Sequence, residues 1–158
     1  MVSIEWCLKQ RNGIEIVTPN KNMSESYLKM AEESINVLSK VVESNIWTAT
    51  TSYYIFYYSL YALMLRIGVK CEIHSCSIEF MKECLKEFYT LDDIKSFENA
   101  FGARIDLQYY SNRPVDKKII DESRKNCKTF FIKTKTIIST IREEQIQSIR
   151  KKLTTKHK

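Results

Sequence analysis

The sequence has very few residues that interrupt helices. Its 158 residues include only three glycines and two prolines. Proline removes a backbone donor and glycine has a high conformational entropy in the unfolded chain, so both residues weaken helix interiors. A chain of this length is typical of one domain with a sizeable core. The scarcity of both residues therefore favours long, uninterrupted helices.

Several familiar catalytic signatures are also missing. The sequence contains no glycine-rich phosphate loop, no Ser/His/Asp set and no pair of carboxylates at general-acid spacing. Only two histidines occur, His74 and His157, the second of them near the end of the chain. A single loop histidine can be a structural hydrogen-bonding residue or a proton-transfer group. Both interpretations of His74 stay open here.

The five cysteines form an odd set without a zinc-binding pattern. Cys71, His74 and Cys76 lie close together in KCEIHSCS, but no second CxxC pair completes four ligands. No apolar segment typical of a signal peptide follows Met1. We therefore expect free thiols in a reducing cytoplasm, and neither a bound metal ion nor another cofactor.

Acidic residues are outnumbered by basic ones. The chain has 25 Lys and Arg against 19 Asp and Glu, a formal net charge of +6. Residues 142–158 carry six Lys or Arg and two Glu, a net charge of +4 (6 − 2). We expect this segment to be a basic C-terminal tail. Such a tail either attracts nucleic acid and other anions non-specifically or is a solvated, frayed end.

One long stretch, residues 45–67, has no charged residue between Glu43 and Arg66 and is rich in aromatic and aliphatic residues. At 3.6 residues per turn its apolar side chains cover nearly every side of a helix. This pattern is typical of a helix at the centre of a bundle or across a membrane. Several Ser and Thr residues, and tyrosines in the middle rather than at the ends, disfavour the membrane. We predict a central helix with part of its surface left for a second copy of the protein.

The remaining segments predict an all-α, up-and-down bundle of four long helices plus a short helix. In an N-terminal arm, residues 1–20, Asn12-Gly13 between two apolar pieces indicates a hairpin, with Trp6 packed on the helical body. Residues 21–141 form the bundle. We expect helices at about 22–43, with Asn22 as cap, at 45–67, with Asn45 as cap and Gly68 as stop, and at 77–88, 91–110 and 116–141.

Polar and apolar residues alternate near the end of the predicted 91–110 helix, in the segment ARIDLQYY, and two tyrosines follow them. Arg104 in this segment can hold a phosphate through forked hydrogen bonds. Alternatively, it forms a structural ion pair, for example with Asp106 across an interface. Arg104 and Tyr109 lie about 140° apart on an ideal helix. They can share a target within one chain only if the helix distorts, whereas two facing copies would bring both Arg104 side chains together.

The order of these segments resembles that of an archaeal-type HEPN domain. The resemblance is carried by TATTSYYIFYYSLYALMLRIG, by EIHS with a following helix, and by AFGARIDLQYY ahead of the last long helix. It spans about residues 3–141 and implies a helical bundle that pairs as a homodimer through the 45–67 and 91–110 helices. Active members of the family are metal-independent ribonucleases with a motif of Arg, a short spacer and His. Others bind nucleotides or have no known activity, and many are encoded beside a small nucleotidyltransferase as toxin–antitoxin pairs.

The resemblance places Arg104 at the motif arginine, but Tyr109 stands where the motif histidine is expected. Tyrosine has a pKa near 10 and is a poor general base at neutral pH, so His74 is the residue that could replace it. Two functions follow. The first is a dimeric module that binds RNA or a nucleotide, or is the partner of a nucleotidyltransferase in a toxin–antitoxin pair. The second is a metal-independent endoribonuclease with a degenerate Arg-x4-Tyr motif.

The candidate site residues fall into two groups. The candidate catalytic residues are Arg104, Tyr109 and His74. The candidate ligand-binding residues are Asp106, Gln108, Tyr110, Arg113 and Lys117, with the further basic residues Lys118, Arg124, Lys125 and Lys128 on the predicted last helix.

Overall fold

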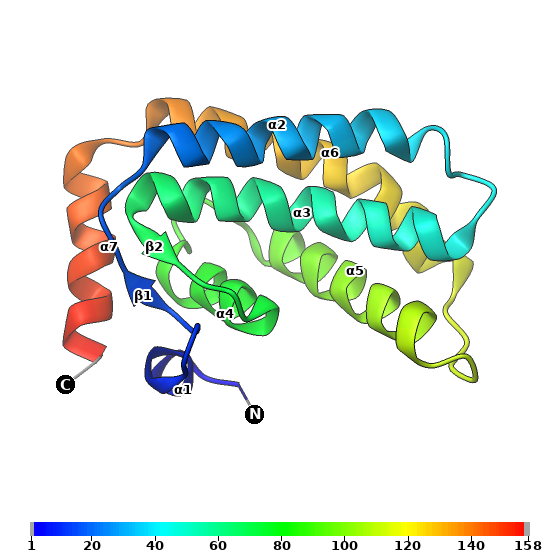
Figure 1. Ribbon diagram of the computed structural model, residues 1–158, viewed down its shortest axis with the longest axis horizontal. Helices are drawn as coiled ribbons and strands as arrows, with labels where there is room; N and C mark the ends of the chain where they lie inside the picture. Colours follow the sequence, from blue (N-terminus) through cyan, green and yellow to red (C-terminus); the bar gives the residue numbers. More distant parts are fainter. Residues whose placement is uncertain (1, 157–158) are drawn as a thin grey trace.

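A computed structural model describes residues 2–156 as a helical bundle with one very small sheet (Figure 1). This confirms the predicted all-α fold class. The helices are α1 (Ile4–Lys9), α2 (Lys21–Leu38), α3 (Asn45–Ile67), α4 (His74–Cys84), α5 (Leu91–Tyr109), α6 (Lys117–Thr140) and α7 (Glu143–Lys156). The strands are β1 (Glu15–Ile16) and β2 (Val69–Lys70), which pair in antiparallel fashion.

The helix α3 lies at the centre of the bundle (Figure 1). It contacts α2, α4, α5, α6 and α7, and its side chains Tyr53, Phe56 and Leu60 are fully enclosed. Burying an aliphatic or aromatic side chain of this size stabilises a fold by about 1.5–3 kcal/mol. The prediction of a central helix with neighbours on several sides is therefore confirmed. No helix within residues 2–156 has both the length and the hydropathy needed to cross a bilayer.

The ends of α3 and α5 follow from local chemistry. The Ser44 hydroxyl accepts a hydrogen bond from the Trp47 backbone N–H, so Ser44 rather than Asn45 caps α3. Gly68 ends the helix with a φ of 88°, as expected from a residue without a side chain. Thr90 and Asp93 form a capping box at the start of α5.

The helix α2 is shorter than predicted because it ends at Leu38 rather than near residue 43. Its start lies slightly earlier than predicted, since Asn20 rather than Asn22 is the cap. Asn20 is fixed twice: its side chain accepts from the Met23 N–H, and its own N–H donates to the carbonyl of Leu65. The second bond ties the start of α2 to the end of α3. Sequence spacing alone could not favour this asparagine over the other.

The N-terminal arm is not a hairpin, which corrects the prediction. The Ser3 hydroxyl caps a helix by accepting from the Trp6 N–H, so the first apolar piece is α1 rather than a strand. A turn does follow, with Asn12 at a φ of 62° and Gly13 so close to the Cys7 carbonyl that no side chain would fit. The strand β1 then pairs with β2 instead of with residues before the turn. Trp6 is 43% exposed and is not one of the buried core residues.

The predicted basic tail is, through Lys156, a packed helix. Ile146, Ile149 and Leu153 of α7 are fully buried at helical spacing. Arg150 donates hydrogen bonds to the backbone carbonyls of Val17, Ile67 and Gly68, which join β1, α3 and β2 at one point. A frayed end is therefore wrong for these residues. His157 lies outside the described residues.

Two of the five cysteines form a disulfide, which corrects the expectation of free thiols. Cys7 of α1 is bonded to Cys76 of α4, with their Cα atoms 5.6 Å apart and a sequence separation of 69 residues. Cys71, Cys84 and Cys127 are free and buried. The spacing of the five cysteines could not reveal this pair, because α1 and α4 meet only in the folded chain.

Candidate functional site

Arg104 on α5 lies among tyrosine rings rather than beside a carboxylate. Its guanidinium carbon is 5.0 Å from the centroid of the Tyr53 ring and 5.1 Å from that of Tyr54. One terminal nitrogen donates to the Tyr54 hydroxyl at 3.3 Å. The buried Nε has no hydrogen-bond partner within residues 2–156. The positive charge thus keeps unused donors, which suits it to hold an anion.

His74 begins α4 and reaches the same group of side chains. Its Nδ1 is 2.5 Å from the hydroxyl of Tyr53, and its ring stacks on that of Tyr57 with centroids 4.2 Å apart. Tyr53 therefore touches His74 on one side and Arg104 on the other. We call these five residues, Tyr53, Tyr54, Tyr57, His74 and Arg104, the Arg104–His74 cluster.

The cluster favours neutral side chains around a single positive charge. Burial, and then the nearby Arg104 guanidinium, lower the pKa of His74 below its ordinary value. Burial raises the pKa values of the Tyr53 and Tyr57 hydroxyls. His74 is therefore uncharged near neutral pH, and the tyrosines are protonated. An uncharged imidazole can take up a proton from a reacting group.

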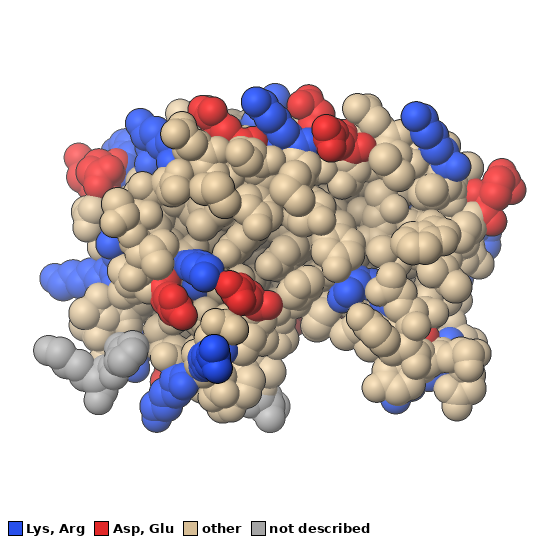
Figure 2. Space-filling view, in the orientation of Figure 1, with Lys and Arg blue, Asp and Glu red and all other residues tan. Residues whose placement is uncertain are grey.

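The surface is hollowed below α3, between the part that carries α1 and α4 and the end of α5 (Figures 1 and 2). We call the region beside this hollow, where α3, α4 and α5 contact one another, the notch. The members of the Arg104–His74 cluster come from the three helices around it: α3, α4 and α5. The notch therefore combines one positive charge, an uncharged imidazole and aromatic rings.

Tyr109 lies nearer to Arg104 than an ideal helix would place it. Its ring centroid is 5.9 Å from the Arg104 guanidinium carbon, and its side chain is 65% exposed. The long arginine side chain covers the angle between the two positions, and Tyr109 is the last residue of α5. The two side chains therefore lie near each other within one chain, although their positions are about 140° apart on an ideal helix. An exposed ring beside a cation can stack on a nucleic acid base.

The other candidate residues of this segment lie apart from the Arg104–His74 cluster. The Asp106 carboxylate pairs with Arg113 at 3.1 Å, so the proposed ion pair between Arg104 and Asp106 is not present within the chain. The Arg113 guanidinium stacks on the ring of Tyr110, 3.6 Å from its centroid. Asp106 also lines a small pocket of about 210 Å³ towards α6. These three residues thus stabilise one another at the end of α5.

Gln108 and Lys117 also lie outside the Arg104–His74 cluster. Gln108 is half-buried on α5. Lys117 opens α6, where its amine lies 3.7 Å from the carboxylate of Asp121 and its side chain is 70% exposed. On the same helix, Arg124, Lys125 and Lys128 surround a shallow basic depression together with Asp121. None of these residues contributes to the five-residue cluster.

Three residues of the cluster, Tyr53, Tyr54 and Tyr57, were not predicted as site residues. The sequence pattern indicates only that they belong to the central helix and its core, and Tyr53 is indeed fully buried. The spacing of Tyr53 and Tyr57 indicates a shared helix face. Nothing in the sequence, however, indicates that this face meets His74 and Arg104.

No metal centre is formed by the described part of the chain. Within residues 2–156, no group of three or more His, Cys, Asp or Glu side chains is arranged to hold a metal ion. Of the three residues in KCEIHSCS, Cys76 is engaged in the disulfide and His74 in the cluster.

The sequence matches no protein-family model, and no curated protein is significantly similar to it.

We predict that His74 titrates below the ordinary histidine pKa of about 6.5 and that Arg104→Gln raises its pKa, because the substitution removes a nearby positive charge. Ring-proton NMR during a pH titration measures both values, and a His157→Gln background leaves one histidine signal. Arg113→Gln is the control, because Arg113 is engaged with Asp106 and Tyr110. A wild-type midpoint at or above the ordinary value would contradict the prediction.

The same shift predicts how stability depends on pH. Because the folded-state pKa of His74 is lowered, the unfolded chain binds a proton more readily than the folded chain. The stabilisation is present above the unfolded pKa of about 6.5 and is lost as the pH falls below it. Urea unfolding of wild type and His74→Gln between pH 5 and 8 should show the smaller loss for the variant.

Proposed function

We propose that the protein is a HEPN-like helical domain that binds RNA, with a phosphate group held by Arg104. The observation that carries the proposal is the Arg104 guanidinium, which lies at the notch among tyrosine rings without a carboxylate partner within residues 2–156. A cation that is not neutralised by the protein can be neutralised by an anionic ligand. The resemblance of the three sequence segments to HEPN domains supports RNA or a nucleotide as that ligand.

The surroundings of Arg104 suit single-stranded RNA. The exposed Tyr109 ring beside the guanidinium can stack on a base while the phosphate is bound. Lys118, Arg124, Lys125 and Lys128 on α6 add positive charge, which attracts a polyanion over a longer distance. Single-strand binding proteins combine these same two features, aromatic rings and a basic surface.

We predict that Arg104→Ala weakens binding of a fluorescently labelled single-stranded RNA by about tenfold or more, because a hydrogen bond to a charged group is worth about 1.5–3 kcal/mol. Fluorescence anisotropy at one fixed salt concentration measures the affinity. Arg104→Lys should fall between wild type and Ala, since lysine keeps the charge but loses the forked geometry.

The matched control for this experiment is Arg142→Ala. Arg142 is 70% exposed at the start of the C-terminal region and is not part of the notch. Its removal lowers the net charge by the same amount as Arg104→Ala. Equal losses of affinity in the two variants would show that only the overall charge matters and would refute a phosphate site at Arg104.

We further propose that two copies pair over a row of tyrosines on α2, α3 and α5. The row runs from Tyr27 to Tyr58 (ring centroids 6.0 Å apart), to Tyr54 (5.3 Å) and, across Arg104, to Tyr109. We call it the tyrosine strip. Figure 2 shows few charged groups in the middle of the face that α2 and α3 form. Exposed Met23, Met30 and Trp47 widen its apolar surface. Pairing there would bring the two Arg104 side chains to one groove.

The resemblance also supports a protein partner of another kind. We propose a minimal nucleotidyltransferase as that partner, in a toxin–antitoxin pair, on the resemblance of the three segments alone.

We predict that the protein has a solution mass of twice 18.7 kDa at micromolar concentration. Tyr58→Lys should reduce it to the mass of one chain, because a charge placed in a buried apolar interface has no partner. Light scattering after gel filtration measures both. Leu91→Lys is the control, since Leu91 is 84% exposed at the start of α5 and outside the strip. A wild-type protein with the mass of one chain would overturn the pairing.

The second candidate function is a metal-independent endoribonuclease, which the position of His74 favours. His74 and Arg104 both touch Tyr53, so a base and a cation lie on the two sides of one buried ring. For His74 to act as base, its Nδ1–H must donate to the Tyr53 oxygen, which leaves the lone pair of Nε2 available. The RNA 2′-oxygen would then attack the adjacent phosphorus while Nε2 takes the 2′-hydroxyl proton.

The remaining steps of that reaction balance without a cofactor. The bond between phosphorus and the 5′-oxygen breaks, and this oxygen takes a proton from water. The hydroxide that remains takes the proton held by Nε2, which regenerates the uncharged imidazole. The products are a 2′,3′-cyclic phosphate and a 5′-hydroxyl. Arg104 would stabilise the negative charge on phosphorus in the transition state. Tyr109 would hold a base rather than transfer a proton.

We predict that the protein cleaves RNA in EDTA and that His74→Ala and Arg104→Ala each lower the rate by about 100-fold or more, as expected for general acid–base and electrostatic catalysis. Gel electrophoresis and end-group analysis measure the rate and the cyclic phosphate. Tyr109→Phe keeps the ring and should retain most of the activity. An RNA with 2′-O-methyl groups should stay intact. If wild type leaves total RNA uncut at high protein concentration, the enzyme is excluded and the binding function stands.

A further inference from the structure

The short helix α1 is attached to the rest of the fold at few places. Ile4, Cys7 and Leu8 face inward, and the Cys7 carbonyl accepts from the Ile14 N–H across the turn. Its covalent attachment is the disulfide from Cys7 to Cys76 at the start of α4. A six-residue helix is too short to be stable by itself in water. Its place in the fold therefore depends on these few contacts.

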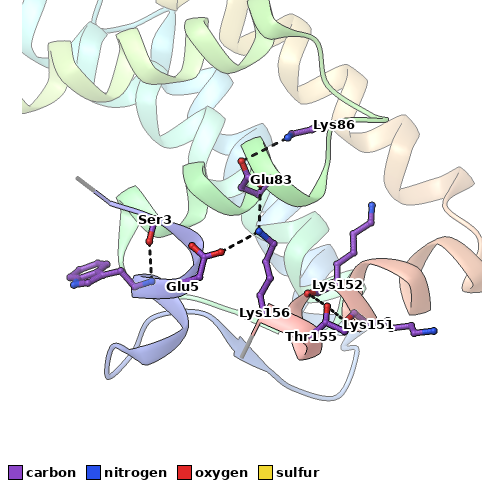
Figure 3. Close-up of polar contacts among 9 residues, drawn as sticks. Ser3, Glu5, Glu83, Lys86, Lys151, Lys152, Thr155 and Lys156 are labelled. Carbon is purple, nitrogen blue, oxygen red and sulfur yellow. Dashed lines mark hydrogen bonds and ion pairs between the residues drawn. The ribbon is translucent and has the colours of Figure 1, made fainter. Parts of the chain in front are cut away.

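The polar contacts of α1 lie on the surface, where α1, α4 and α7 meet (Figure 3). The amine of Lys156 lies 3.3 Å from the Glu5 carboxylate and 3.7 Å from that of Glu83. All three side chains are at least one-third exposed. Ion pairs between exposed side chains contribute little, because water and salt screen them. Without the disulfide, these contacts would hold α1 only weakly.

The disulfide is joined directly to the helical turn that carries His74. Cys76 follows His74 by two residues in the first turn of α4. Ile73 is the N-cap residue, and its side chain makes no capping hydrogen bond. The first turn of α4 therefore lacks the stabilisation that a polar N-cap residue gives. The ring of His74 packs on Tyr57, and Cys76 is fully buried against α1. The position of His74 therefore depends on what holds Cys76.

We propose that the Cys7–Cys76 disulfide is a redox latch: when oxidised it clamps α1 on α4 and holds His74 in the Arg104–His74 cluster, and its reduction releases both. The reductant is a dithiol, whose two sulfurs are oxidised to a disulfide while two electrons and two protons pass to Cys7 and Cys76. The effect of the latch on RNA binding or cleavage rests on the proposed function. The movement of α1 and His74 on reduction is independent of that function.

The test is deuterium exchange of the full chain, without RNA, before and after treatment with dithiothreitol. At labelling times of seconds to minutes we expect uptake to rise at least tenfold in residues 4–9 and 74–78 and to stay unchanged in α3 and α6. The His74 pKa, measured by NMR, should rise towards its ordinary value as the ring becomes hydrated. Cys7→Ser should show both changes without reductant.

Cys84→Ser is the matched control, because Cys84 is a buried free thiol at the other end of α4. It should behave as wild type in both redox states. Unchanged exchange and an unchanged His74 pKa on reduction would overturn the latch and leave a structural cross-link. A simultaneous rise in all helices would overturn it as well, since the bond would then support the whole fold. If Cys7→Ser does not fold, chemical reduction of wild type still decides the question.

The two proposals can fail separately. Loss of RNA binding in both redox states would contradict the proposed function and leave the exchange result intact. Unchanged exchange with normal RNA binding would contradict only the latch.

Discussion

The burial of most of α3 is the main physical requirement that the other helices satisfy. A helix with apolar side chains on nearly every side leaves little room for water, so α2, α5 and α6 cover most of it, while Trp47 stays exposed and Tyr54 and Tyr58 stay partly exposed. This enclosure determines where the other helices lie, and it brings the end of α5 and the start of α4 against the same half of α3. The cluster at the notch is thus a consequence of packing around Tyr53 and its neighbours.

The tyrosines of α3 serve the fold and the candidate site together. Their rings supply apolar surface for the core, and their hydroxyls supply hydrogen-bond partners where the core meets the notch. Tyr53 is fully buried, yet its hydroxyl reaches His74 and its ring faces Arg104. Phenylalanine at this position would fill the same space but leave the Nδ1 of His74 without this partner. The abundance of tyrosine over phenylalanine in α3 fits such a double role.

Much of the fold could be predicted from the sequence, because the signals for helices are local. The apolar pattern of residues 45–67, the stop at Gly68 and the Thr90–Asp93 cap all depend on residues within a few positions of one another. The errors concern long-range partners. The strand β1 pairs with β2 across the whole of α2 and α3, and Cys7 finds Cys76 across 69 residues. The helix α7 was missed because its buried residues are few and its basic residues dominate the composition.

For the candidate site, too, the sequence indicated a residue with a local pattern but not the contacts between helices. Arg104 was singled out from its local pattern, and it lies beside Tyr53 and Tyr54 with a buried Nε that has no hydrogen-bond partner within residues 2–156. The proximity of Tyr109 to Arg104 was not predicted, because ideal helix angles ignore the reach of a long side chain. The position of His74 and Arg104 beside the same tyrosine, Tyr53, could not be predicted, because it depends on how α4 packs against α3.

The separation of Arg104 and His74 onto two helices has a mechanical consequence. When a cation and a base share one helix, the helix itself fixes their distance. Here the distance depends on the packing of α4 against α3, and the start of α4 lacks a side-chain cap. Small movements of an element with few contacts require little free energy. A site divided in this way is therefore open to control from outside it, and the only covalent bond that reaches α4 from another helix within residues 2–156 is attached two residues from His74.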